Sequence, residues 1–277
     1  MDAAMAETRA MPADDPDAGW ERQRRREAWR RRLLPLAGGA VLLFIWWALV
    51  AVFHVRPFIA PSPEVVAITF YQKFGMLMSN LGPTALEALC GFMLGNLAAI
   101  AIATVFVHRK GVEQAFFPIA VLIHSVPVVA TAPILVLLLG NGLAPKIAIA
   151  AIICFFPTLV NMVRGLESVG AQHMELMHVL SASPREVFFK LRVPNSLPYL
   201  FAALRIATAT ATVGAIVGEW IGSQVGIGAL IIQATYNFDS ALLYATVLCG
   251  SVFSIVFFQV VRLIERLTLR WDAAVAA

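Results

Sequence analysis

The residues that could do chemistry are few and lie far apart in the sequence. The five histidines are His54, His108, His124, His173 and His178. They do not form the H-E-x-x-H spacing that holds zinc on one helix face, and no nucleophile motif accompanies them. The three cysteines, Cys90, Cys154 and Cys249, lie inside apolar stretches without metal-ligand spacing, which favours small buried side chains. We therefore predict no metal site and no catalytic site in the chain itself.

Nucleotide binding by the chain is equally unsupported. The sequence contains no G-x-x-x-x-G-K-[ST] loop that could hold phosphates. The Gly-Ile-Gly at 226–228 lacks the third glycine and the strand-to-helix setting of a dinucleotide site. If ATP drives this protein, a partner must bind it.

The elements that position these residues are predicted to be membrane helices. The chain is 60% hydrophobic and 14% charged, with a mean hydropathy of +0.79, whereas soluble domains are roughly 45–50% apolar and 25% charged. A helix needs about 20 apolar residues to cross a bilayer. Six windows meet this requirement: 34–54, 81–107, 115–139, 146–163, 198–218 and 241–261. The sequence thus predicts an all-α integral membrane protein with six spans.

Basic residues set the predicted orientation. Eight of the 21 Lys and Arg residues are arginines in the first 32 positions, directly before the first window. With that end in the cytoplasm, 17 of the 21 fall on the cytoplasmic side, which predicts both termini inside. This placement explains the net charge of +4 without nucleic-acid binding.

Three regions follow from this pattern. Residues 1–33 are predicted to be a disordered basic tail, because their start is rich in Ala, Asp and Pro without apolar periodicity. Residues 34–265 form the six-span domain with a cytoplasmic loop at 164–197, and residues 266–277 form a second tail.

The fifth window carries a polar stripe. Arg205, Thr208, Thr212 and Glu219 lie at offsets 0, 3, 7 and 14, on one helical face. Arg205 and Glu219 are about 21 Å apart along a helix, so each needs its own partner. Because ionisable groups at membrane depth often mark a pathway, the stripe is a candidate for one, with bundle packing as the alternative.

Two further features of the spans are interpreted as packing. Gly214, Gly218 and Gly222 have small-xxx-small spacing, which allows close helix approach within one chain or across a homodimer seam. Glu87 in the second window is interpreted as a buried hydrogen-bonding residue.

The cytoplasmic loop reads as two helices joined by a turn. Ser183, Pro184 and Glu186 form an S-x-x-E capping box with proline at the first helical position, so a short helix is predicted from Pro184. Pro194 predicts that it ends near Val193, and residues 167–180 are predicted to form the preceding helix. On the second helix, Val187, Phe188 and Leu191 share an apolar face suited to a protein groove. Helices lying on lipid headgroups are the alternative, while DNA binding is disfavoured for a loop pinned to a bilayer.

This loop resembles the signature loop of the inner-membrane permeases of bacterial ATP-binding cassette (ABC) importers. Glu175, Leu176 and Met177 stand at its E-A-A positions, and Ser181 replaces its glycine. Its A-S pair and closing prolines are matched by Ala182-Ser183, Val193-Pro194 and Leu197-Pro198. The stretches PSPEV at 61–65, SVPVVATAPILVLLLGNG at 125–142 and GEWIGSQVGIGALI at 218–231 are similar to the nitrate, sulfonate and taurine branch. The resemblance covers roughly residues 57–265.

The resemblance implies a machine with several parts. It implies a type I importer permease in the bacterial inner membrane, paired with a second copy of itself. Two cytoplasmic ATPases would use ATP and Mg²⁺, and an extracytoplasmic substrate-binding protein would deliver the solute. The branch suggests a small organic anion such as a sulfonate, taurine or nitrate. A pyrimidine precursor of thiamine, or riboflavin, is the alternative, because the 218–231 stretch looks equally like such permeases.

In that family the loop contains a coupling helix that docks on the ATPase. The residues this assigns to coupling are Glu175, Ser181, Ala182, Ser183, Pro184, Arg185, Glu186 and Phe188. We expect Glu175, Arg185 and Phe188 to determine docking. Because a left-handed turn suits glycine better, we expect Ser181 to alter the turn slightly or to cap it with its hydroxyl group. An ion-driven transporter predicts an inverted repeat that is not evident here. A membrane scaffold without transport is a third reading.

Overall fold

The computed structural model describes residues 16–269, with side chains described from residue 33 onward. The chain divides into two compact units at residues 56 and 57, which we describe separately. The first contains α1 (Pro16–Val52), whose apolar part, Leu33–Val52, is long enough to cross a membrane. The helix begins at Pro16, earlier than the predicted end of a disordered tail at residue 33, because Ala, Glu, Gln and Arg from residue 18 onward are strong helix formers. Residues 1–15 and the end of the second predicted tail, 270–277, lie outside the described residues.

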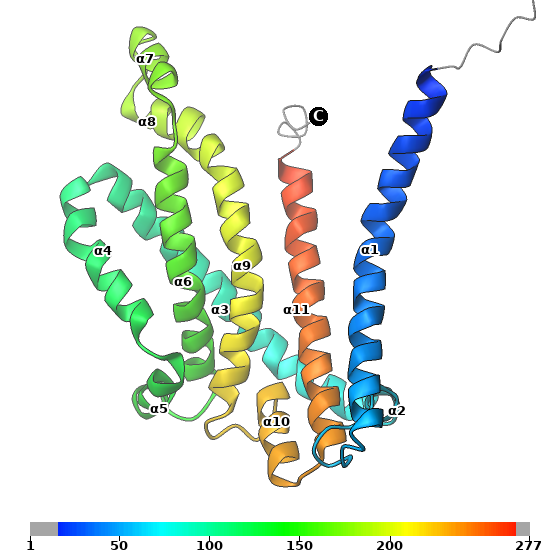
Figure 1. Ribbon diagram of the computed structural model, residues 1–277. Helices are drawn as coiled ribbons and strands as arrows, with labels where there is room; N and C mark the ends of the chain where they lie inside the picture. Colours follow the sequence, from blue (N-terminus) through cyan, green and yellow to red (C-terminus); the bar gives the residue numbers. More distant parts are fainter. Residues whose placement is uncertain (1–15, 270–277) are drawn as a thin grey trace, which may run out of the picture. The chain divides into compact units, whose positions relative to one another are not determined.

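Every element of secondary structure in the described residues of the second unit is a helix (Figure 1). Its first helices are α2 (Pro63–Gln72), α3 (Phe74–His108), α4 (Lys110–Ser125), α5 (Val128–Leu139) and α6 (Leu143–Glu167). The loop region contains α7 (Ala171–Val179), α8 (Pro184–Glu186) and the π-helical η1 (Val187–Arg192). The chain then forms α9 (Val193–Glu219), α10 (Ile227–Tyr236) and α11 (Ser240–Thr268).

Over the described residues, five helices are long and apolar enough to cross a membrane, or six if α4 and α5 together form one span. These two helices meet at a bend of 99°. The predicted window at 115–139 therefore contains two helices joined at a bend, and it remains a sixth span if the pair crosses the membrane together. Pro127 explains the break, because a proline disfavours helical geometry in the residue before it, and Val126 is extended at φ −73° and ψ 128°.

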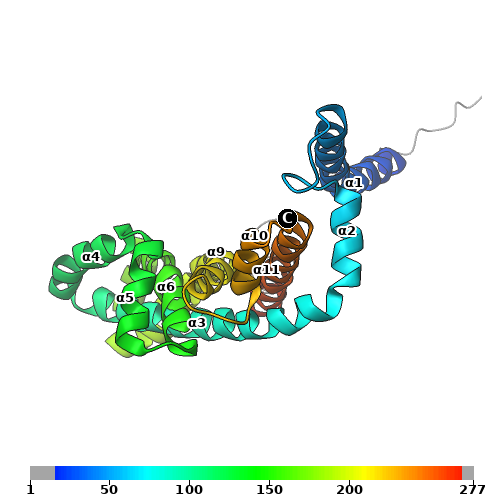
Figure 2. The ribbon, with the colours of Figure 1, turned by 90° about the horizontal axis from the view of Figure 1, so that it is seen from below.

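Helices α3, α6 and α9 pack tightly against one another, with α3 running along α6, α9 and α11 (Figure 2). A Cβ on Gly214 would lie 2.7 Å from the Cα of Ala150, and one on Gly218 would lie 3.0 Å from the Cα of Lys146. These two glycines therefore let α9 approach α6 within one chain, as the packing interpretation expects. Gly222 was wrongly included with them, because it follows the end of α9 in a turn with φ +74°.

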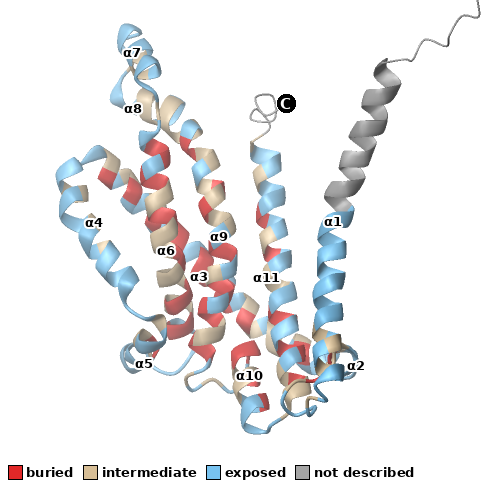
Figure 3. Cartoon of the chain, viewed as in Figure 1, coloured by how far each residue is buried: buried red, intermediate tan, exposed pale blue. Residues whose placement is uncertain are grey.

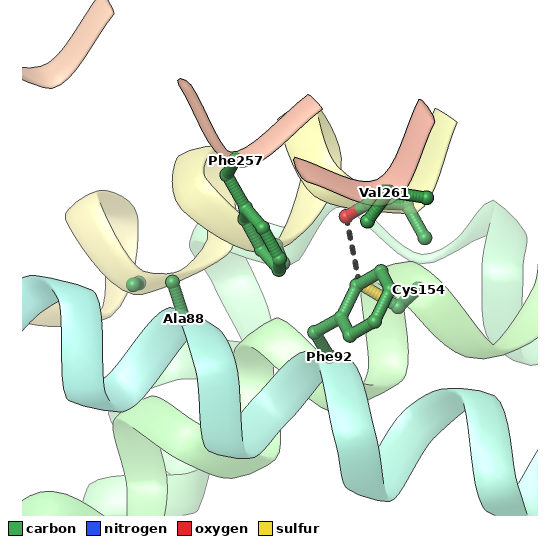
Figure 4. Close-up of a cluster of buried hydrophobic side chains, with 8 residues drawn as sticks. Ala88, Phe92, Cys154, Phe257 and Val261 are labelled. Carbon is green, nitrogen blue, oxygen red and sulfur yellow. Dashed lines mark hydrogen bonds between the residues drawn. The ribbon is translucent and has the colours of Figure 1, made fainter. Parts of the chain in front are cut away.

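Buried side chains line the facing surfaces of these helices (Figure 3). One cluster joins Ala88 and Phe92 of α3 to Cys154 of α6 and to Phe257 and Val261 of α11 (Figure 4). The rings of Phe92 and Phe257 meet edge to face at 4.9 Å. The Cys154 thiol donates to the carbonyl of Ala207 at 3.4 Å, so this cysteine is a packed side chain, as the sequence suggests.

The second unit has two opposite ends. The segment from α7 to η1 lies at the same end as the C-terminal end of α11 (Figure 1). Helices α5 and α10 lie at the opposite end. The candidate coupling residues and the buried charges described below therefore belong to opposite ends of α9.

Candidate functional sites on the coupling segment and at the far end of α9

The turn after α7 is a Schellman motif centred on Ser181. The amide of Ser181 donates to the carbonyl of His178 at 2.9 Å, and the amide of Ala182 donates to that of Met177 at 3.0 Å. Ser181 has φ +53°, the left-handed conformation that glycine adopts without strain. The serine therefore keeps the turn that a glycine would make.

The predicted capping box follows this turn. The amide of Glu186 donates to Ser183 Oγ at 3.3 Å, and the amide of Ser183 donates to Glu186 Oε2 at 3.0 Å. Lys190 Nζ donates to the other oxygen of Glu186 at 2.9 Å. The start of a helix at Pro184 is thus confirmed, and two successive motifs fix the backbone from residue 178 to residue 186.

The prediction that the second loop helix ends near Val193 is wrong. The helix continues from Pro184 through η1 into α9, giving one helix to Glu219. The amide of Val193 donates to the carbonyl of Phe188, five residues earlier. This wider π turn accommodates Pro194, which has no N–H to donate and whose ring would crowd a regular α-turn. The preceding helix also differs, because it breaks at residues 168–170 before α7 begins.

The apolar face of this second helix turns toward the membrane part of the chain. Phe188 packs its ring 4.8 Å from that of His108 at the end of α3, and it lies against the cluster that contains Phe106 and Leu166. The neighbouring Phe189 is exposed instead. The expectation that Phe188 docks directly in a partner groove therefore conflicts with its position; Phe188 links η1 to α3.

The sequence analysis did not identify three exposed apolar side chains on α7. Leu176, Val179 and the adjoining Leu180 are each more than half exposed. Their spacing of i, i+3 and i+4 places them on one helical face, a signal that was present in the sequence. Glu175 and Arg185 are exposed nearby in the chain. We call Leu176, Val179 and Leu180 the α7 triplet.

The polar stripe of α9 lies mainly inside the unit. Thr208, Thr212 and Glu219 are buried, and Thr212 Oγ1 donates to the carbonyl of Thr208 at 2.9 Å. Arg205 forms an ion pair with Glu265 of α11 at 3.1 Å. As expected, Arg205 and Glu219 have separate partners. Thr212 also lines a pocket of about 340 Å³ between α9, α10 and α11, together with Ser251 and Ser254.

Glu219 belongs to a buried polar cluster at the far end of α9. Its Oε1 accepts from Thr84 Oγ1 at 2.6 Å, and its Oε2 accepts from the amide of Gly228 at 2.5 Å. Beside it, Lys146 of α6 pairs with Glu87 of α3 at 2.9 Å. The interpretation of Glu87 as a buried hydrogen-bonding residue is confirmed. Its partner Lys146 was missed, because 59 residues separate the two in sequence.

This cluster holds the N-terminal end of α10. The amide of Gly226 donates to Asn80 Oδ1 at 3.0 Å, and that of Ile227 donates to Thr84 Oγ1 at 2.8 Å. With the Gly228 bond, three successive amides bind side chains of α3 and α9. Since a helix start leaves such amides without backbone partners, these side chains serve as its cap. The described residues include no group of three or more His, Cys, Asp or Glu side chains arranged to hold a metal ion.

Known proteins are similar to this chain in sequence and in fold. A family described as "Binding-protein-dependent transport system inner membrane component" matches residues 91–270. The riboflavin transport system permease protein RibX of Chloroflexus aurantiacus is 34% identical over 84% of this chain and 88% of its own. The formylaminopyrimidine transport permease protein ThiX of Halalkalibacterium halodurans is 31% identical over 83% and 93%.

More distant similarities agree with these. A putative aliphatic sulfonates transport permease protein, SsuC of Bacillus subtilis, is 28% identical over 90% of each chain. Among solved structures, inward-facing conformations of the MetNI methionine ABC transporter match with a TM-score of 0.57 at 18% identity, over 72% of this chain and 96% of the other. That likeness shows a common fold.

Proposed function

Because the chain belongs to the family of binding-protein-dependent transport system inner membrane components, we propose that two copies of it form the membrane core of an importer. The chain is a permease subunit of an ABC importer, a multi-pass membrane protein and a transport component rather than an enzyme. Importers of this family work with an ATPase and a substrate-binding protein. In the proposed assembly, two ATPases bind ATP and Mg²⁺ in the cytoplasm, and the binding protein delivers the solute at the other side.

The proposed orientation places the segment from α7 to η1 and both termini in the cytoplasm. The excess of Lys and Arg supports it, because basic loops stay on the cytoplasmic side. The end of the unit with α5 and α10 then faces the binding protein.

The proposed coupling surface is the α7 triplet with Glu175 and Arg185. The exposure of three apolar side chains on a short helix outside the apolar spans is the observation that carries this assignment. The Schellman turn and the capping box hold this helix in place, which reduces the ordering cost of docking. Phe188 then transmits movement from the surface to α3 through His108. In this scheme Ser181, Ala182, Ser183, Pro184 and Glu186 shape the segment, and the triplet makes the contact.

The proposed pathway follows α9 at Thr212. The pocket at Thr212 is lined mostly by apolar side chains, with the hydroxyl groups of Thr212, Ser251 and Ser254 among them. The two cations closest to the ends of the stripe, Arg205 and Lys146, are already paired with Glu265 and Glu87. Arg205, Thr208 and Glu219 are then positioning residues of the helix that carries Thr212. Such a lining suits a solute that forms hydrogen bonds without a strong charge.

We therefore favour a small nitrogen heterocycle as the solute class. Support comes from RibX and ThiX, whose names specify riboflavin and formylaminopyrimidine, at 34% and 31% identity. A small organic anion is the second candidate, supported by SsuC, which is named for aliphatic sulfonates and aligns over 90% of the chain.

Coupling is tested by co-purification in mild detergent with candidate ATPase subunits, comparing wild type with Glu175→Arg and, as a matched control, Glu175→Gln. We expect the charge reversal to weaken the complex and to uncouple ATP hydrolysis from transport, while the neutral variant stays close to wild type. Unchanged coupled transport in Glu175→Arg would contradict the docking role proposed for this residue. A wild-type chain that binds no ATPase would contradict the proposed assembly.

The solute class is tested in nanodiscs that contain the permease and its ATPase. ATPase activity is measured with binding proteins loaded with riboflavin, a formylaminopyrimidine or an aliphatic sulfonate. Stimulation by a binding protein loaded with a heterocycle supports the favoured class. Stimulation by the sulfonate-loaded binding protein alone would contradict it and support a small organic anion as the solute.

A further inference from the structure

The cluster at the far end of α9 contains more acid than base. Glu87 is 0% exposed, Glu219 is 1% exposed and Lys146 is 6% exposed. With every group ionised, the cluster would carry one net negative charge in an environment of low dielectric. Burying an uncompensated charge is strongly unfavourable, so a protein avoids that state or neutralises it.

Hydrogen bonding identifies where the missing positive charge is needed. Glu87 Oε1 accepts from Lys146, whereas Glu87 Oε2 is buried and has no hydrogen-bond partner among the described residues. Both oxygens of Glu219 have donors, Thr84 and the Gly228 amide. Glu87 and Glu219 are neighbours in the cluster, because Thr84, which donates to Glu219, lies one turn before Glu87 on α3, and Gly218, which precedes Glu219, packs on Lys146, the partner of Glu87. Two ionised carboxylates so placed repel, whereas a single proton between them supplies the missing donor.

We propose that Glu87 and Glu219 share one proton, so that this cluster is a buried proton-binding site that carries no net charge beside Lys146. The proposal does not depend on the transported solute or on any partner.

The groups that face this site come from several elements. They are Asn80, Thr84 and Glu87 of α3, Lys146 of α6, Glu219 of α9, Ser223 of the following turn and the first amides of α10. Lys146 also donates to Ser223 Oγ at 2.8 Å, so one ammonium already serves two acceptors. Of the facing side chains, Glu87, Lys146 and Glu219 are the ionisable ones. Lys146 can balance one carboxylate, and the shared proton balances the other.

The bound proton also controls α10. A Cβ at Gly226 or Gly228 would collide with the side chain of Glu219, so the backbone of α10 lies directly on this carboxyl group. Removing the proton leaves a buried negative charge, which hydration of the site would relieve. Hydration requires the turn at 220–226 and the start of α10 to move away from α3. Loss of the proton should therefore loosen α10.

Infrared spectroscopy of the full chain in nanodiscs tests the site directly, because a protonated carboxyl group has a C=O stretching band separate from that of a carboxylate. We expect wild type at neutral pH to show such a band, and Glu219→Gln and Glu87→Gln each to lose it. Glu265→Gln is the matched control, since Glu265 is a carboxylate paired with Arg205. A wild-type spectrum without this band, or a band that survives in both site variants, overturns the proposal.

Hydrogen exchange provides a second test, in which no transport is measured. After correction for the intrinsic effect of pH, the amides of Gly226, Ile227 and Gly228 should exchange faster once the infrared band has been titrated away. In Glu219→Gln the introduced side chain cannot ionise, so the protection of these three amides should not change with pH. If wild-type protection stays constant while the band disappears, the proposed control of α10 is refuted. Because no transport assay is involved, this result is independent of the proposed function.

Discussion

Ser181 shows how one residue can keep a turn that it does not favour. Its φ of +53° costs a residue with a β-carbon about 1–2 kcal/mol. We predict that Ser181→Gly stabilises the Schellman turn by about 1 kcal/mol. Slower hydrogen exchange at the amides of residues 181 and 182 measures this effect. Ser181→Ala, which keeps the β-carbon and removes the hydroxyl, should exchange like wild type. If both variants slow the exchange equally, the hydroxyl and not the β-carbon is the cause.

Lys146 is the buried cation on which the far end of the fold depends. Removing one partner of a buried ion pair costs about 3–5 kcal/mol, because the other partner keeps its desolvation penalty. We predict a loss of this size for Lys146→Met, measured by thermal unfolding in detergent. Lys73→Met is the control, since the pair of Lys73 with Asp239 is more than a third exposed and should contribute at most about 1 kcal/mol. Equal losses in the two variants would contradict the assigned role of burial.

On α7, the triplet is the proposed docking surface. A charge at Val179 would have to be desolvated on binding, so we predict that Val179→Asp weakens ATPase association at least about tenfold, or 1.4 kcal/mol. His178→Asp adds the same charge to an exposed residue on the opposite face of the helix and should bind nearly normally. Association is measured by titrating a labelled ATPase subunit into permease nanodiscs. If both variants lose binding equally, charge alone accounts for the effect.

The N-terminal cap of α11, formed by Asp239, should be lost at low pH. Burial raises the pKa of Asp239, but the hydrogen bond from the Leu242 amide and the nearby Lys73 ammonium lower it more, so the net pKa lies below the ordinary 3.8. Because the folded pKa is depressed, the cap is complete above about pH 3.9 and is lost as pH falls through the folded value. We predict faster exchange at the Leu242 amide in acid, after intrinsic correction. In Asp239→Asn the exchange should not depend on this titration.

Sequence reasoning succeeded for elements whose causes are local. Ser183 and Glu186 cap a helix three residues apart, and the α9 stripe follows from its period. It failed where a local rule had a competitor. Averaged hydropathy concealed the break at Pro127, and a π turn carried the helix through Pro194. Sequence reasoning could not identify the partners of Glu219. Thr84 lies 135 residues away, and only the packing of α3 on α9 brings the two side chains together.

For the whole molecule, the proposed orientation requires the two ends of the second unit to lie on opposite sides of the membrane, with α7 in the cytoplasm. Val179 of α7 and Tyr236 of α10 are a matched pair for this test, since each is 79% exposed. A single cysteine is introduced at either position after Cys90, Cys154 and Cys249 are replaced by alanine. We predict that a membrane-impermeant maleimide labels Tyr236→Cys in intact cells, whereas Val179→Cys reacts only after permeabilisation. The reverse pattern would invert the proposed orientation and remove the α7 triplet from the reach of any cytoplasmic ATPase. Labelling of both sites in intact cells would mean that the excess of Lys and Arg does not set the topology of this chain.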